Sequence, residues 1–364
     1  MGKRRSIIKD FLLKLKSSKK PLEEIDGLVE NQNIAALLRR KILEEKLNIS
    51  LSATGSSILD FVETEGKISY KSIGAIQVPV TVIGPLKIEG YYVRDEKYIP
   101  LASIYPALME AVDLGAKIIG DTRIRVKINR CWLRLFTISP RRRPIDLCRI
   151  VESEIQTINE SGKLKILCFG RGAGHIINTV MIGENGVCKT LTKWVEAKDL
   201  NNLLVKTIGS RIPVITPYLV FDTSINTDIH KGKLGDYNIE PNLFLEAYNA
   251  LEDLKPIDNS LQPIILGVLT SFYSSIGIKP EYALRSDIRQ YNAYTKFRKI
   301  TVSINSRIIF PLTININELS IMNKEVIGIL RLESLKSKYL SEIASALVLV
   351  AYIGLIASIA KASI

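Results

Sequence analysis

The feature that most constrains the fold is an uncharged segment near the C-terminus. Between Glu342 and Lys361 the chain has 18 residues without a charged side chain, IASALVLVAYIGLIASIA. A stretch of this length is at the lower limit for a helix that spans a bilayer. A helix that is apolar on all sides also fits the centre of a large soluble core. Because small residues such as Ser345 and Gly354 interrupt the run, we expect a buried core helix and no membrane span.

Composition places the chain among soluble globular proteins. Its 364 residues suffice for roughly two domains, and 46% hydrophobic with 24% charged residues is an ordinary balance. The net charge of +13 suits an acidic partner such as nucleic acid or a membrane surface. The basic residues are not interleaved with aromatic ones, so no nucleic-acid partner is expected.

The spacing of the cysteines bears on whether the chain binds a metal, and the N-terminal sequence bears on where in the cell the protein resides. The four cysteines form no C-x-x-C pair, so no metal site is expected. Asp10, Lys14 and Lys16 interrupt the first apolar run, which argues against a secretory signal. These features favour a cytoplasmic protein with free thiols.

Periodicity predicts a mixture of helices and strands. Helical spacing covers 33–47 and 105–119, strict alternation over 122–138 predicts a strand, and 163–182 fits a hairpin with a glycine-rich turn at 170–174. Further helices are expected at 5–17, 144–162, 197–207, 242–254, 263–276, 317–332 and 341–362, and further strands at 75–93, 187–195, near 212–222 and twice within 299–315. Strands and helices alternate without strict βαβ order, so the expected class is α+β.

Residues 73–90, IGAIQVPVTVIGPLKIEG, contain a dense set of turn residues. Pro79 and Pro85 lack a backbone N–H donor, which places them at a sheet edge or turn. Gly84 permits a sharp bend between them.

This segment resembles the entry strand of the HMG-CoA reductase family, with motif IG-x-x-x-(I/V)P-x-GVAGPL-x-x-x-G. The matching residues are Ile73, Gly74, Pro79, Gly84, Pro85, Leu86 and Gly90. Thr81 stands where the family has a glycine. A second family motif, P-(L/M)-A-T-T-E-G, aligns with the residues that begin at Pro100. The glutamate of the motif aligns with Tyr105 and its last glycine with Pro106.

The resemblance implies that the catalytic positions of the family are replaced. Tyrosine has an ordinary pKa near 10, so Tyr105 is no substitute for the catalytic carboxylate near neutral pH. The family aspartate of GQD-P aligns with Lys279, and the C-terminal histidine that protonates the CoA thiolate aligns with Ser363. Serine does not titrate near pH 7.

The cofactor motifs of the family are also missing. DAMGMN and the lysine of DKK have no counterpart, which indicates a deletion after the hairpin at 163–182. The GTVGGGT loop aligns with residues 307–313, which include Phe310 and Pro311 but no glycine. Glycine is what allows a backbone to approach a dinucleotide closely. No NADP(H) is therefore expected.

The resemblance also implies a domain organisation. Residues 1–119 and 186–364 would form the large domain around the long C-terminal helix. Residues 120–185 would form a truncated, ferredoxin-like α+β remnant of the small NADP-binding domain.

Three functions fit the sequence. The first is a non-catalytic relative with a binding, assembly or regulatory role linked to the mevalonate and isoprenoid pathway, as a homodimer or a heteromer with an active reductase paralogue. In that case Arg39 and Arg40 could contact the phosphates of a CoA-type ligand, although an exposed helix face explains them as well. The second is an active NADPH-dependent hydroxymethylglutaryl-CoA reductase with rearranged residues. The third is a basic protein that binds membranes or nucleic acid.

Overall fold

The structure, a computed structural model, describes residues 24–25, 32–52, 78–138, 165–169, 176–182, 214–254, 261–311, 314, 316, 319–332 and 335–363. Its helices are α3 (Gln32–Leu47), α5 (Pro106–Ile119), α9 (Lys231–Gly235), α10 (Pro241–Leu254), α11 (Leu261–Ser275), α12 (Glu281–Leu284), α13 (Ile321–Ile329) and α14 (Ser337–Ala362). Its strands are β1 (Val80–Glu89), β2 (Glu96–Ala102), β3 (Ile124–Ile138), β4 (Lys165–Phe169), β5 (Ile176–Ile182), β6 (Val214–His230), β7 (Asp287–Lys296) and β8 (Lys299–Pro311). The mixture confirms the α+β class.

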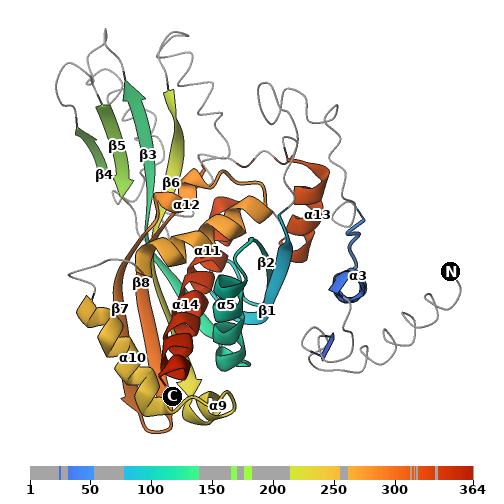
Figure 1. The fold of residues 1–364 in the computed structure, drawn as a ribbon. Helices are drawn as coiled ribbons and strands as arrows, with labels where there is room; N and C mark the ends of the chain where they lie inside the picture. Colours follow the sequence, from blue (N-terminus) through green and yellow to red (C-terminus); the bar gives the residue numbers. More distant parts are fainter. Residues whose placement is uncertain are drawn as a thin grey trace, which may run out of the picture.

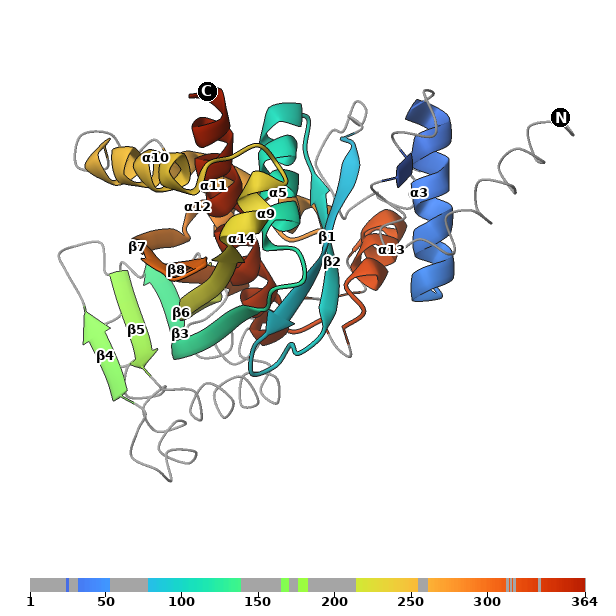
Figure 2. The same cartoon turned by 90° about the horizontal axis from the view of Figure 1, so that it is seen from below.

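One twisted sheet organises these elements. Its strands follow the order β2-β1-β3-β6-β8-β7, and the β4–β5 hairpin joins through β5 to β3. All pairs are antiparallel except β1 with β3. Helices α5, α10, α11 and α14 lie on one side of the sheet, as Figures 1 and 2 show. Polar side chains line the opposite face of the four strands β3, β6, β8 and β7.

The C-terminal helix lies at the centre of the core, as the sequence predicts. Every residue of α14 from Ile343 to Ile353 is fully buried. Its only polar side chain in that stretch besides the tyrosine is Ser345, whose hydroxyl lies 3.0 Å from Thr223 Oγ1 on β6. By length and composition α14 could cross a membrane, but 83% of its most apolar 18-residue stretch is buried inside the protein. The helix is thus accounted for as a core helix.

Helices α5 and α14 approach each other closely because both carry glycine at the crossing. A Cβ on Gly115 would lie 2.8 Å from the Gly354 amide nitrogen and would collide with the Val350 carbonyl oxygen. A Cβ on Gly354 would collide with the carbonyl of Ala111. The backbones can touch only without these side chains.

The proline-rich entry strand is β1, and it contains a bulge. The register with β2 shifts between Ile83 and Leu86, so Gly84 and Pro85 lie outside the regular ladder. Gly84 has φ +117°, and a Cβ there would lie 2.7 Å from the Lys97 carbonyl oxygen. Among the described residues, this half of β1 pairs with β2 alone, since β1 pairs with β3 at Ile88 and Glu89. Pro85 therefore costs the sheet no hydrogen bond.

Several predicted elements differ from those observed. β7 was not predicted, and the two short strands expected within 299–315 are one strand, β8. β6 continues eight residues past the predicted end at 222, and α13 is shorter than 317–332. The predicted elements at 5–17, 144–162, 187–195 and 197–207 and the turn at 170–174 lie outside the described residues, whereas the hairpin that flanks this turn is present as β4–β5.

At one end of the molecule α3 packs on α13, away from β7 (Figure 2). Leu43 and Leu47 of α3 form a small cluster with Ile329.

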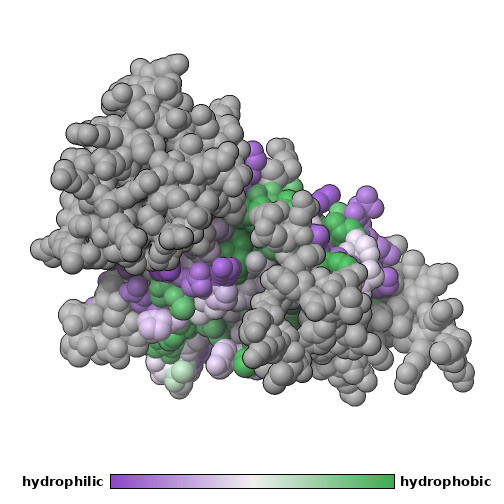
Figure 3. All heavy atoms as spheres, turned by 90° about the horizontal axis from the view of Figure 1, so that it is seen from above, coloured by the Kyte–Doolittle hydropathy of each residue, from purple (hydrophilic) through white to green (hydrophobic). Residues whose placement is uncertain are grey.

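At the domain boundary expected at residue 120, β3 begins in the main core and pairs with β6 along most of its length. The division into two domains stays a prediction. From above, the described surface shows hydrophobic areas between hydrophilic ones (Figure 3).

Candidate functional site

The turn between β2 and α5 holds the first predicted site residue. Tyr105 is the residue before the helix, its N–H donates to Ser103 Oγ at 3.1 Å, and Pro106 occupies the first helical position. Proline suits that position because its missing N–H would have no helical partner. The side chains of Ile104 and Tyr105 are 62% and 67% exposed. The turn thus presents apolar and aromatic groups to solvent where the family motif has its acid.

The second predicted residue, Lys279, follows the end of α11. Gly277 reverses the chain with φ +73°, and the Asn323 side chain donates to the Ser275 carbonyl at 3.0 Å. Ser275 Oγ in turn donates to the Pro100 carbonyl of β2 at 2.9 Å. The elements that precede Lys279 and Tyr105 therefore touch, which brings the two turns to one region. Lys279 itself is exposed.

Phe310 and Pro311 end β8 and do not form a loop, contrary to the alignment with a glycine loop. Phe310 is fully buried, and its ring lies 4.6 Å from that of Tyr273. The Tyr273 hydroxyl donates to the Ile309 carbonyl at 2.8 Å, and Ser337 Oγ donates to the Pro311 carbonyl at 2.8 Å. These residues do not fit a dinucleotide, because a packed ring and a regular strand occupy the place of an open glycine loop.

Ser363 lies just after the last turn of α14 and is exposed. Its hydroxyl donates to the Ile359 carbonyl of its own helix at 2.9 Å.

Arg39 and Arg40 lie half-buried on α3. Helix α3 contacts the rest of the protein mainly through α13, with its apolar side formed by Leu38, Ile42 and Leu43. The two arginines are therefore near neither Ser363 nor the polar face of the sheet.

A buried carboxylate that sequence reasoning missed holds the turn after β1. Glu342 of α14 accepts the backbone N–H groups of Tyr91 at 2.8 Å, Tyr92 at 3.0 Å and Val93 at 2.8 Å. A Cβ on Gly90 would collide with this carboxylate. Burial raises the pKa of Glu342 to about 7, although the three N–H groups and Arg94 act in the opposite direction. The final glycine of the β1 motif is explained by this contact.

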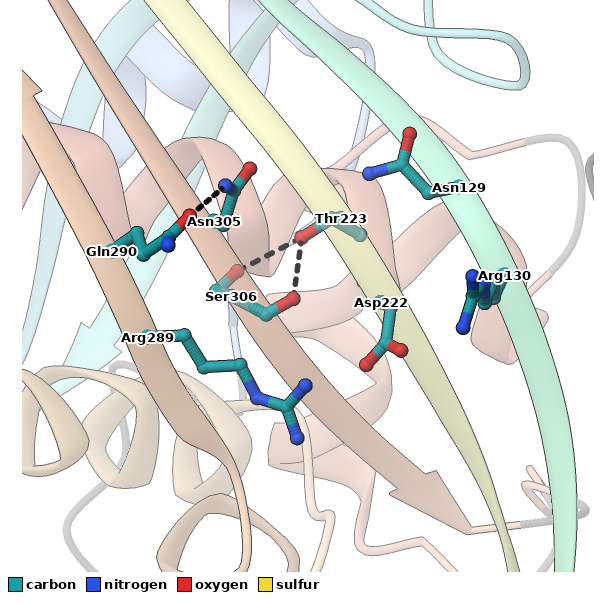
Figure 4. Close-up of a pocket in the computed structure, with 8 residues that line it drawn as sticks. All are labelled: Asn129, Arg130, Asp222, Thr223, Arg289, Gln290, Asn305 and Ser306. Atoms are coloured by element: carbon teal, nitrogen blue, oxygen red, sulfur yellow. Dashed lines mark hydrogen bonds between the residues drawn. The ribbon is translucent and has the colours of Figure 1, made fainter.

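A cavity of about 500 Å³ lies on the polar face of the sheet. It is lined by Asn129, Arg130, Asp222, Thr223, Arg289, Gln290, Asn305 and Ser306, which come from four adjacent strands (Figure 4). None of these residues was predicted as a site, because strand pairing alone brings them together. In the described part of the chain, no three His, Cys, Asp or Glu side chains are arranged to hold a metal ion.

Comparison with known sequences identifies relatives for part of the chain. The sequence profile of the hydroxymethylglutaryl-coenzyme A reductase family matches residues 35–134. A 3-hydroxy-3-methylglutaryl-coenzyme A reductase from Aeropyrum pernix is 42% identical over 128 residues, which are 34% of this chain and 30% of that relative. A reductase of the same name from Pyrococcus abyssi is 30% identical over 176 residues, 45% of this chain and 41% of the relative. The chain spans less than half the length of these curated relatives.

Solved structures extend the similarity of the fold. A 3-hydroxy-3-methylglutaryl-coenzyme A reductase of Streptococcus pneumoniae aligns with 94% of this chain and 97% of its own, with a TM-score of 0.52 and 13% identity. The class II enzyme from the same organism, bound to NADPH, aligns with 88% of this chain at a TM-score of 0.54 and 12% identity. At such identities the likeness concerns the architecture. The segment at residues 35–134, which includes the entry strand and the Tyr105 turn, is thus similar in sequence to the hydroxymethylglutaryl-coenzyme A reductase family, and the chain shares the fold of these solved structures.

Proposed function

We propose that this chain is a family member that does not catalyse the reduction of hydroxymethylglutaryl-CoA and acts by binding, in assembly or regulation linked to mevalonate and isoprenoid synthesis. The observation that carries the proposal is the β2–α5 turn, where the exposed Tyr105 stands at the position of the family acid. A phenol is a far weaker acid than a carboxyl group and does not exchange protons as a carboxylate does near pH 7.

Two other sites support the same proposal. Lys279 puts a positive charge where the family motif has an aspartate, and Ser363 bonds back to its own helix. Phe310 fills the end of β8 where the family motif has glycines. Catalytic groups of one site act as a unit, so the joint replacement leaves little rate enhancement.

NADPH oxidation with hydroxymethylglutaryl-CoA tests the proposal. An active reductase of the family serves as the positive control, and Tyr105→Phe as the matched variant. We expect both the natural chain and the variant to stay at the background rate. Turnover that scales with the concentration of the purified protein would instead establish an active reductase.

A CoA-type ligand is the first binding candidate, with its phosphates at Arg39 and Arg40. Titration with CoA should give saturable binding that weakens about tenfold when both arginines are replaced by glutamine, since charge-assisted hydrogen bonds to phosphate are lost. Lys41→Gln on the same helix is the control, because Lys41 already pairs with Glu44 at 2.6 Å. Equal weakening by the control would reject these contacts.

The predictions of a cytoplasmic location and of a homodimer, or a heteromer with an active reductase paralogue, are part of the same proposal. Light scattering after size exclusion, with and without a co-expressed reductase, measures the assembly. A strictly monomeric chain that never co-elutes with the reductase would contradict it.

A further inference from the structure

A β-bulge on β3 turns two consecutive polar side chains toward the open face of the sheet. The register with β6 passes from Ile128 to Arg130, so Asn129 is an extra residue. Ile128 and Cys131 are buried on either side, whereas Asn129 is partly exposed and Arg130 is exposed. A bulge of this kind redirects side chains and is common beside binding sites.

A second bulge lies on β7, at the same level of the sheet. Here the register with β8 passes from Ile288 to Gln290, so Arg289 is the extra residue. Ile288 and Tyr291 are buried, and Arg289 and Gln290 between them are both exposed. The two bulges flank the β6–β8 pair from opposite sides, and the cavity lies between them (Figure 4).

A chain of hydrogen bonds crosses all four strands at the floor of this cavity. Asn129 Nδ2 donates to Ser224 Oγ at 2.6 Å, and Ser224 Oγ donates to Asn305 Oδ1 at 2.7 Å. Asn305 Nδ2 donates to Gln290 Oε1 at 3.0 Å. This order fixes the orientation of the amides, so the Gln290 amide nitrogen remains as a donor at the edge of the cavity.

The charges around the cavity leave a cationic excess. Asp222 is held by Arg307, with N–O distances of 2.8 and 3.3 Å, so its charge is compensated. Arg289 donates to Asp287 at 3.1 Å through Nε, which leaves its terminal nitrogens for other partners. Arg130 has no hydrogen bond or ion pair within the described residues. Three guanidinium groups thus face two carboxylates.

We propose that this cavity binds a small molecule through an oxyanion, a carboxylate or a phosphate, held by Arg130 and Arg289 and oriented by Asn129 and Gln290. Guanidinium groups bind both oxyanions through paired hydrogen bonds. A cavity of about 500 Å³ is of the size that holds a metabolite. The site is separate from the positions at Tyr105, Lys279 and Ser363, and it does not depend on whether the chain is catalytic.

Calorimetric titration of the full chain with inorganic phosphate and with glutarate tests this site. We expect saturable binding of at least one probe, weakened about tenfold or more by Arg130→Gln and by Arg289→Gln, because each removes charge-assisted hydrogen bonds. Asn305→Asp should weaken binding as well, since it adds a negative charge to the floor. Lys127→Gln is the matched control: it removes one exposed charge from the same face of β3 outside the cavity.

The two probes distinguish the kinds of ligand that the cavity could bind. Binding of phosphate alone assigns a phosphorylated ligand, binding of glutarate alone a carboxylate, and binding of both a general oxyanion site. No saturable binding of either probe would overturn the proposal. So would a loss in Lys127→Gln equal to that in Arg130→Gln, because the attraction would then be a diffuse effect of the basic surface. A thermal melt of each variant confirms that the fold is retained.

Discussion

Replacing Glu342 by glutamine should remove a pH dependence from the stability of the protein. The carboxyl has a pKa near 4.5 when exposed, and burial raises its pKa to about 7 in the folded chain. The folded state therefore binds the proton more tightly than the unfolded state. The stability that this provides is fully present below pH 4.5 and is lost as the pH rises through 7.

The magnitude follows from the size of the shift. A difference of about 2.5 pKa units corresponds to about 3 kcal/mol, most of which falls between pH 5 and pH 8. Glutamine has no titratable group, so the Glu342→Gln variant should not show this loss. The variant itself should be less stable at pH 5, since its amide group places donors against the N–H groups of Tyr91 and Val93.

Urea denaturation at pH 5, 6, 7 and 8 measures the free energy of unfolding of both proteins. The difference between them should change by 2–3 kcal/mol over this range, with the natural chain losing stability at high pH. Glu281→Gln, an exposed carboxyl on α12, is the control and should leave the slope unchanged. Parallel curves for the natural chain and Glu342→Gln, within about 0.5 kcal/mol, would refute the reasoning.

Further predictions concern the glycines of the core. Gly354→Ala should lower the melting temperature by several degrees, since its Cβ would collide with the Ala111 carbonyl and overpacking costs about 1–3 kcal/mol. Gly235→Ala, with nothing within 4 Å of its Cβ, should melt as the natural chain does; equal losses in both variants would contradict the account. Gly90→Ala should displace the Glu342 carboxylate and reduce the pH dependence described above, which the same urea series measures; an unchanged slope would argue against the contact.

The parts of the fold that follow from local pattern could be predicted from the sequence. The apolar run of α14 fits only a buried or membrane helix, and the alternation from Ile124 to Ile138 specifies a strand. β7 was missed because its bulge puts Arg289 and Gln290 side by side and breaks the two-residue period. Strands were predicted within 299–315, but as two short ones, whereas the inward alternation continues through Ile308 and Phe310 to the end of one strand, β8.

The site was less predictable than the fold. Motif comparison located the Tyr105 turn, but the neighbourhood of Lys279 depends on the long-range contact between Ser275 and Pro100. The cavity on the sheet combines residues from positions 129, 222, 289 and 305, and nothing local indicates that these strands lie side by side. Glu342 looked like a charge that ends an apolar run, whereas it binds a turn some 250 residues earlier in the chain.

The measurement that tests the central claim most directly is calorimetric titration of the purified chain with NADPH. With Phe310 packed on Tyr273 at the end of β8, the account predicts no saturable binding up to millimolar NADPH, while an active reductase of the family binds it under the same conditions. Saturable binding of NADPH to this chain would contradict the claim that the chain has kept the fold but lost the groups needed for hydride transfer.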